Sequence, residues 1–295
     1  MAEKLAMTNG AGRTVQLIYN CSAGRHCRER VAALRRSYEA NGARVILSEC
    51  GPGAEIAIDE EASHVCAVGG DGTVRHVALA VARSGRPLPI GVYPGGTVNL
   101  LHRELASPLD PDEHALRALS GDGACVHYSV EINDTLFLAC ASIGPDSHTV
   151  AALSAPLKRR IGKLAYAAAF LQVLVRWPRH RIRLRHDGGE LACEACYVAK
   201  GRYFAGPWSF APDAQLCLPL LHVIALEGAR RRDYARFLWA MLRGRRIDAL
   251  PGVVAFTCTA LTLEAAVPLP VQADGDIVAT LPACIRLKAD PLSFC

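Results

Sequence analysis

The sequence contains no apolar run long enough for a membrane-spanning helix. Its longest apolar segment, Leu164 to Val175, is interrupted by Gln172 and falls well short of the roughly 20 residues that such a helix requires. The opening residues Met1-Ala2-Glu3-Lys4 continue into polar sequence instead of the apolar stretch of a secretory leader. Together these two absences predict a cytoplasmic protein.

Two common site patterns are also missing. No Gly-x-Gly-x-x-Gly opens a helix, which argues against a nicotinamide-dependent oxidoreductase. Cys193 and Cys196 form a Cys-x-x-Cys pair that no second pair completes, and on one strand residues three apart point to opposite faces. The twelve cysteines are scattered, many of them inside apolar strands, so we expect reduced core residues and no disulfides. No set of residues predicts a metal held by the protein itself.

The composition is that of a globular protein with a sizeable core. Of 295 residues, 51% are hydrophobic and 21% are charged, which allows two domains or one large one. There is no internal repeat, no low-complexity tract and no long linker. The formal net charge of +5 fits an anionic ligand or a membrane surface without requiring either.

The most informative stretch is the loop Gly69-Gly70-Asp71-Gly72-Thr73. A buried strand is expected before it, at 64–68, and a helix after it, at 74–83. Glycines let a ligand approach the backbone closely, and the N–H groups at a helix start attract phosphate. Asp71 repels phosphate, so an acid here makes sense if magnesium or a proton transfer lies between them. The alternative is an ordinary Asp-Gly turn between strand and helix.

Strands and helices alternate through the first part of the chain. The spacing predicts strands at 15–19, 45–47, 64–68 and 90–93, helices at 27–40, 74–83 and 111–120, and partly helical structure at 51–63. This order indicates a Rossmann-like α/β domain with a parallel sheet, covering residues 1–125. Three strands end in loops of glycine or small polar residues, at 20–24, 69–73 and 94–99, and ligands bind at such strand ends.

From residue 126 to 295 the pattern changes to a mostly antiparallel β-sandwich or partial barrel. Hairpins are expected around Asn133-Asp134, joining 126–132 to 136–138, and around 187–189, joining 181–185 to 190–199. Further strands are expected at 221–226, 253–263 and 277–281, and helices only at 161–176 and 233–243. The final strand is a candidate to return to the first domain.

Taken in order, these motifs resemble the diacylglycerol kinase catalytic-domain family. That family contains bacterial diacylglycerol kinases and related lipid kinases, sphingosine kinases and ceramide kinases, and the resemblance runs from about Tyr19 to Leu287. The matching segments are Asn20–Gly24, Ser48, Gly69–Thr73, Gly96-Thr97-x-Asn99 with Arg103–Leu105, Lys158–Tyr166, Gly201–Gly206, Ala211–Ala214 and Pro270–Asp276.

The resemblance implies a kinase that transfers the γ-phosphoryl group of ATP to the hydroxyl of a diacylglycerol-, sphingoid- or ceramide-type lipid, with Mg²⁺ as the ATP complex. It implies that Asp274 and Asp276 take the proton of the acceptor. The implied nucleotide residues are Asn20, Gly24, Ser48, Gly69, Gly70, Asp71, Gly72, Thr73, Gly96, Thr97 and Asn99. The expected partners are a lipid substrate and, peripherally, an anionic membrane; no nucleic acid is expected, and a homodimer stays open.

Several residues depart from the family pattern. Arg75 and His76 replace the usual Asn and Glu, Leu100 replaces an aspartate, and Asp276 replaces a glutamate. Leu218 lies in the stretch 215–219, where many bacterial members carry Asp-Asp-Gly and bind an accessory magnesium, so we expect no such site here. These departures leave a second interpretation open, a degenerate member that binds nucleotide or lipid without efficient catalysis. A soluble-substrate kinase, such as an NAD kinase, is a third.

Overall fold

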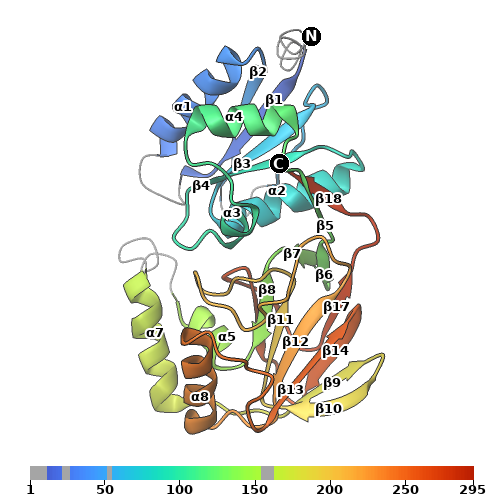
Figure 1. Cartoon of the computed structure of the whole chain (residues 1–295). Helices are drawn as coiled ribbons and strands as arrows, with labels where there is room; N and C mark the ends of the chain where they lie inside the picture. The colour runs from blue at the N-terminus through green and yellow to red at the C-terminus, as the bar shows by residue number, and fades with distance from the viewer. Residues whose placement is uncertain (1–11, 22–26, 52–54, 154–162) are drawn as a thin grey trace. The chain divides into compact units, whose positions relative to one another are not determined.

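The computed structural model describes residues 12–21, 27–51, 55–153 and 163–295 (Figure 1). The chain divides into two compact units. The first comprises residues up to 127 together with 291–295, and the second comprises residues 128–290. All twelve cysteines are free thiols. None of the helices in the described ranges is long and apolar enough to cross a membrane.

The first unit is built on one six-stranded sheet in the order β2-β1-β3-β4-β18-β5. Strands β1 to β4 pair in parallel, and β18 lies parallel to β4 and antiparallel to β5. The strands are β1 (Thr14–Tyr19), β2 (Arg44–Glu49), β3 (His64–Gly69), β4 (Ile90–Pro94), β5 (Cys125–His127) and β18 (Leu292–Phe294). The predicted parallel α/β sheet is therefore confirmed.

Four helices accompany this sheet: α1 (Cys27–Ala40), α2 (Asp71–Ser84), α3 (Leu100–Leu105) and α4 (Pro111–Ser120). The predicted helix at 111–120 is confirmed as α4. The Asp110 carboxylate caps its start by accepting from the N–H groups of Asp112 and Glu113, and Gly121 ends the helix at a φ of 75°. Helices α1 and α4 share one apolar cluster with β1, which includes Leu17, Leu34 and Ala115.

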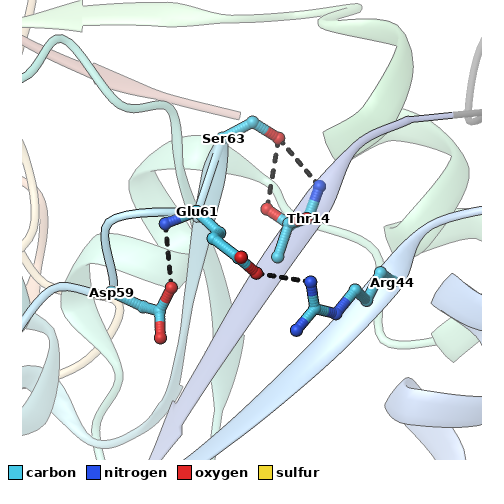
Figure 2. Close-up of polar contacts among 5 residues, drawn as sticks. All are labelled: Thr14, Arg44, Asp59, Glu61 and Ser63. Atoms are coloured by element: carbon cyan, nitrogen blue, oxygen red, sulfur yellow. Dashed lines mark hydrogen bonds and ion pairs between the residues drawn. The ribbon is translucent and has the colours of Figure 1, made fainter.

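The described part of the segment 51–63 contains no helix, so that prediction was wrong. Side chains tie it to the neighbouring strands instead, as Figure 2 shows. The Ser63 hydroxyl donates to the Thr14 carbonyl and accepts from the Thr14 N–H, at 3.1 Å each, while Arg44 pairs with Glu61. Contacts to residues that lie elsewhere in the sequence outweigh the local helical preference of an acidic segment.

His114 of α4 lies in the interior of the first unit. Its ring stacks on Tyr93 with 5.2 Å between ring centroids, and its Nε2 lies 3.9 Å from the Cys66 sulfur. Burial, and to a smaller extent the nearby His102 and Arg117, lower the pKa of His114 to about 4. The ring is therefore neutral in the folded protein.

This burial predicts a pH dependence of stability. Between about pH 6.5 and pH 4 the unfolded chain binds a proton at His114 that the folded chain excludes, so stability falls as the pH drops through this window. The pKa difference corresponds to a loss of up to about 3 kcal/mol. Thermal unfolding of wild type and His114→Gln at pH 7 and pH 4 measures it. Between pH 7 and pH 4, His114→Gln should lose less stability than wild type. Replacement of the exposed His76 by glutamine should give the same loss as wild type. An equal loss in His114→Gln and wild type would contradict the assignment.

The second unit is a sandwich of two six-stranded sheets, ordered β10-β9-β14-β17-β6-β7 and β13-β12-β11-β8-β15-β16. All pairings within them are antiparallel, as predicted. Their strands are β6 (Val130–Ile132), β7 (Thr135–Phe137), β8 (Cys140–Ile143), β9 (Ile182–His186), β10 (Gly189–Cys193), β11 (Ala195–Ala199), β12 (Leu221–Leu226), β13 (Val253–Cys258), β14 (Ala260–Ala265), β15 (Pro270–Ala273), β16 (Asp276–Thr280) and β17 (Ala283–Leu287). Apolar side chains from both sheets, such as Leu263 and Val198, form one core cluster between them.

The described part of this unit contains three helices: α5 (Pro145–Ala151), α7 (Lys163–Arg176) and α8 (Arg231–Leu242). Helix α5 was not predicted, because only the segments 161–176 and 233–243 were expected to be helical. Tyr197 of β11 contacts α8, since its hydroxyl donates to that of Tyr234 at 3.1 Å and its ring centroid lies 4.8 Å from that of Phe237. Strand β11 is thus buried on both faces, which explains why its sequence is an unbroken apolar run.

Three predicted strands are interrupted. The segment 253–263 was predicted as one strand, but it divides into β13 and β14, which belong to different sheets. The segment 126–132 was predicted as one strand, but β5 belongs to the sheet of the first unit and β6 to the sandwich. Cys193 and Cys196 do not share a strand, because β10 ends before Glu194 and β11 begins after it. Glu194 accepts from the Arg179 guanidinium and from the Ala229 N–H, and both cysteines turn into the same core cluster.

Candidate functional site

The first candidate site is formed by two glycine loops that touch in the first unit. One connects β3 to α2, and the other follows β4. The Gly95 N–H donates to the Gly69 carbonyl at 2.7 Å, which joins the loops. A Cβ added to Gly96 would lie 2.6 Å from the Cα of Gly70, so no side chain fits where the loops meet.

Asn99 shapes the second loop from within. Its φ of 53° is left-handed, a conformation that asparagine tolerates better than most residues. Its Oδ1 accepts from the Gly96 N–H at 2.9 Å and its Nδ2 donates to the Gly96 carbonyl at 3.0 Å. Asp71 reaches the same region, because its Oδ1 accepts from the Leu101 N–H at 3.2 Å. These side chains hold the backbone of the loop in shape.

Helix α2 begins directly at the contact between the loops. No side chain caps it, since its N-cap residue is Gly70. Thr73 is buried and packs under the loop, where a Cβ on Gly69 would come within 2.5 Å of its Oγ1. The N–H groups and the positive end of the helix dipole lie at the glycine loops, which suits a phosphate group.

A cavity of about 340 Å³ adjoins the second loop. Its lining comprises Arg30, Tyr93, Pro94, Gly96, Asn99 and Leu109. The Arg30 guanidinium donates to the Pro94 carbonyl at 3.3 Å and adds positive charge at the rim. The volume lies in the range of small-molecule pockets. Glycine backbone, a cation and an uncapped helix start therefore occur together.

The remaining predicted nucleotide residues differ in their surroundings. Asn20 follows β1, and its N–H donates to the Val68 carbonyl at 3.3 Å beside the first glycine loop. The Ser48 hydroxyl accepts from Gln16 at 2.9 Å, and Thr97 is exposed. Gly24 lies outside the described residues.

The second candidate site is the turn 274–276 between β15 and β16, in the second unit. Asp274 and Gly275 both have positive φ values, 49° and 85°, as a two-residue hairpin requires and as the Asp-Gly sequence favours. Ala273 pairs with Asp276 across it, and a bulge lies between Val271 and Gln272.

The two aspartates of this turn have different surroundings. Asp274 is only 5% exposed, and its carboxylate accepts from three backbone N–H groups: Leu138 at 2.8 Å, Ala139 at 2.9 Å and Cys140 at 3.2 Å. This set of donors fits an ionised carboxylate and fastens the turn to β8 and the residues before it. Asp276 is half-buried at the first position of β16. Of the two, Asp276 has the side chain that a ligand can reach.

The residues at 215–218 do not fit the accessory magnesium that many bacterial members of the family bind. The ammonium group of Lys200, fully buried, donates to the carbonyls of Gln215, Leu216 and Leu218 at 2.9, 2.8 and 2.6 Å. A cation supplied by the chain already binds these carbonyls. Across the described ranges, no cluster of three or more His, Cys, Asp or Glu side chains is arranged to hold a metal.

We therefore predict that magnesium activates the protein in one phase only. With ATP held constant, activity should rise until magnesium matches ATP and should then stay level, because Lys200 leaves no place for a second ion. Initial rates across a magnesium titration measure this. A second rise that disappears on substitution of residues 215–218 would contradict the prediction.

Sequence reasoning missed three residues of these sites: Arg30, Lys200 and Gln272. A signal for Lys200 was present, since a lysine that ends the apolar run 195–199 must find partners for its charge. Gln272 lies in the segment Pro270–Asp276, which matches the family pattern, but the sequence does not show which way its side-chain amide points. Nothing near Arg30 distinguishes it from the other arginines of α1.

Comparison with known proteins agrees with this architecture. The family model of the diacylglycerol kinase catalytic domain matches residues 14–127, and that of the YegS C-terminal NAD kinase beta sandwich-like domain matches residues 139–294. A diacylglycerol kinase of Staphylococcus aureus (strain JH9) is 25% identical over 280 residues, which cover 92% of this chain and 88% of the relative. A diacylglycerol kinase of Staphylococcus carnosus (strain TM300) is 25% identical over 229 residues, covering 77% of this chain and 74% of the relative.

Solved structures share the fold. A crystal structure of a diacylglycerol kinase from Bacillus anthracis str. Sterne superposes with a TM-score of 0.71 at 16% identity, covering 96% of each chain. A second structure from that organism reaches 0.79 at 19% identity, covering 96% of this chain and 94% of the other. Since the two family models span both units in this order, the chain belongs to the diacylglycerol kinase catalytic-domain family.

Proposed function

We propose that the chain is an ATP-dependent lipid kinase, which transfers the γ-phosphoryl group of ATP to a lipid hydroxyl. The observation that carries this proposal is the contact of the two glycine loops, where Gly96 and Gly70 leave no room for a side chain beside an uncapped helix start. Such a surface of backbone N–H groups suits the phosphates of a nucleotide.

The first unit is assigned to the nucleotide. The backbone at 69–73 and 95–97 would bind the phosphates, and the cavity beside Arg30 and Asn99 would take another part of the molecule. Asp71 lies between Gly70 and Gly72 in the first loop, and its carboxylate oxygens would hold the magnesium of the ATP complex. Bound Mg²⁺ neutralises phosphate charge during phosphoryl transfer.

The second unit is assigned to the acceptor. Asp276 would accept the proton from the lipid hydroxyl as the O–H bond breaks and the new O–P bond forms, with ADP as the leaving group. Asp274 would keep the turn in place through its three backbone N–H donors. The two carboxylates that the family resemblance treats alike thus receive different roles.

The decisive experiment is a transfer assay with purified protein, labelled ATP and a panel of lipids in mixed micelles. Diacylglycerol, a sphingoid base, ceramide and phosphatidylglycerol are the lipid acceptors, NAD is offered separately as a soluble acceptor, and chromatography identifies the labelled product. Labelled lipid that depends on Asp276 supports the proposal. ATP binding without labelled lipid would identify a degenerate member, and labelled NAD would identify the soluble-substrate alternative.

We also propose that the second unit contacts anionic membranes through α7 and α8. These helices lie side by side in Figure 1, and the Arg231 guanidinium joins them by donating to the carbonyls of Leu174 and Val175 at 2.8 to 3.1 Å. On α7, Leu171 is 62% exposed and Val175 is 80% exposed. Apolar side chains facing water on a helix fit the interfacial region of a bilayer.

Helix α8 adds an aromatic residue and positive charge. Trp239 and Leu242 are exposed, and the Arg243 guanidinium lies 4.3 Å from the Trp239 ring centroid. Arg236 lies on the exposed side of the helix, and Arg232, also exposed, pairs with Asp233 at 3.6 Å. Other arginines of the second unit are less suitable, because Arg179 pairs with Glu194, and Arg183 and Arg185 both pair with Glu190.

This surface predicts a loss of membrane binding on substitution of α8. The pair Trp239→Ala and Arg236→Glu should lower binding to anionic vesicles by at least about tenfold, because each arginine near such a surface contributes about 1 kcal/mol. Sedimentation with neutral and anionic vesicles at low and high salt measures it. Arg183→Glu is the control of equal charge change. Equal binding of wild type to both vesicle types would reject the electrostatic contribution.

A further inference from the structure

A row of buried polar side chains lies behind the turn 274–276. Gln272 of β15 and Ser142 of β8 oppose each other in the sheet, and the Gln272 Nε2 donates to the Ser142 Oγ at 2.9 Å. The Ser142 hydroxyl in turn donates to the Asp146 carboxylate of α5. At its other end, the Gln272 Oε1 accepts from the Gly275 N–H at 2.8 Å. The row therefore runs from α5 to the middle of the turn.

The direction of these hydrogen bonds follows from the groups themselves. A carboxylate accepts only, so the one proton of the Ser142 hydroxyl goes to Asp146. The oxygen of Ser142 can then only accept, so the NH₂ group of the Gln272 amide must face it and donate. The carbonyl side must consequently face Gly275, where it accepts the N–H of the turn. A flipped amide would set two donors against each other at Gly275 and two acceptors against each other at Ser142.

The surroundings of Asp146 keep this end of the row in place. Burial raises the pKa of Asp146, while hydrogen bonds from the Ser142 hydroxyl and from backbone N–H groups favour its ionised form. Burial also raises the pKa of Tyr197 well above its usual value, so its hydroxyl stays protonated and donates to Tyr234. Ser142 has no exposed surface, and Gln272 is 4% exposed, so water does not compete for these bonds.

We propose that Ser142, Gln272 and Asp146 are positioning residues, which orient the Gly275 N–H and thereby set the place of Asp276 toward the acceptor hydroxyl. The bulge directly before Gln272 supports this, because it changes the register so that Gln272 pairs with Ile277 while Val271 pairs with Ala279. This inference rests on the proposed function, in which Asp276 of this turn accepts the proton of the acceptor hydroxyl.

The test uses Ser142→Ala, which removes the hydroxyl that links Asp146 to Gln272. We expect kcat to fall by about tenfold or more with the KM for ATP unchanged, because a displaced base slows the chemical step without touching the nucleotide. Thr149→Val is the matched control. It deletes another buried hydroxyl of the same unit, which donates to the Pro145 carbonyl within α5 at 2.7 Å. It should leave kcat unchanged.

A second measurement does not depend on activity. Hydrogen exchange of the Gly275 amide, followed by NMR, should be slow in wild type and should quicken by at least about tenfold in Ser142→Ala and not in Thr149→Val. Gln272→Met provides the same test if Ser142→Ala folds poorly. If wild type transfers no phosphoryl group, the proposed function fails and the exchange result alone decides the inference. The inference would be overturned if Gly275 exchange were unchanged in both Ser142→Ala and Gln272→Met. It would also be overturned if Thr149→Val lost as much kcat as Ser142→Ala.

Discussion

Replacement of Asp276 by asparagine is expected to lower kcat by about 10²- to 10⁴-fold, the range that a general base contributes. The amide has the shape of the carboxylate but cannot accept the proton of the acceptor hydroxyl. ATP affinity should stay at the wild-type value, because Asp276 belongs to the second unit and the glycine loops to the first. Thermal stability should also be unchanged, since the side chain is half-buried at a strand start.

The neighbouring Asp274 provides the contrast. In Asp274→Asn, an NH₂ group must replace one carboxylate oxygen that now accepts from backbone N–H groups, so two donors face each other. We expect a lower melting temperature together with lower activity. Asp276→Glu restores the residue usual in the family and should be neutral or faster. Full activity in Asp276→Asn would move the base to another carboxylate, with Asp274 and Asp71 the next candidates.

Replacement of Gly96 by alanine is expected to weaken ATP binding by about 100-fold. The added Cβ would lie 2.6 Å from the Gly70 Cα and 2.9 Å from the Asn99 Oδ1, closer than such atoms approach. Because the first neighbour is backbone, no side chain can turn aside and the two loops must separate. A displacement of about 1 Å in such a site costs on the order of 10²-fold.

Titration calorimetry with ATP and circular dichroism measure this effect against folding. Gly51→Ala is the matched control, since a Cβ there meets nothing within 4 Å. Wild-type affinity in Gly96→Ala would mean that the contact between the loops is not the phosphate site. The cavity beside Arg30 would then be the remaining candidate within the first unit.

The departures from the family pattern fall at different depths in the first unit. Arg75 is 5% exposed on α2, His76 is exposed, and Leu100 is buried at the start of α3. None of the three is a glycine of the loops, so the backbone that would hold phosphate is intact. An active wild type would therefore show that these positions tolerate other residues, whereas binding without transfer would trace the loss to the acceptor side.

The sequence by itself determined most of the first unit. Helix 27–40, the capped helix 111–120 and four strands of the parallel sheet were predicted near their observed bounds. These elements follow from periodicity, capping residues and turn residues, all of which act within a few positions of each other. The turn at Asp274-Gly275 was not predicted as a hairpin, although its positive φ values are ones that an Asp-Gly sequence accommodates.

Tertiary structure alone decided how the polar groups are used. Asp274 and Asp276 look alike in sequence, but Asp274 is buried and its carboxylate accepts from three N–H groups of residues more than 130 positions away. Gln272 is oriented by Ser142 across a similar separation, and Lys200 by the carbonyls of 215–218. A carboxylate, an amide or an ammonium has several partners of similar strength available. Which one it takes depends on the neighbour that folding brings within about 3 Å, and local sequence does not contain that information.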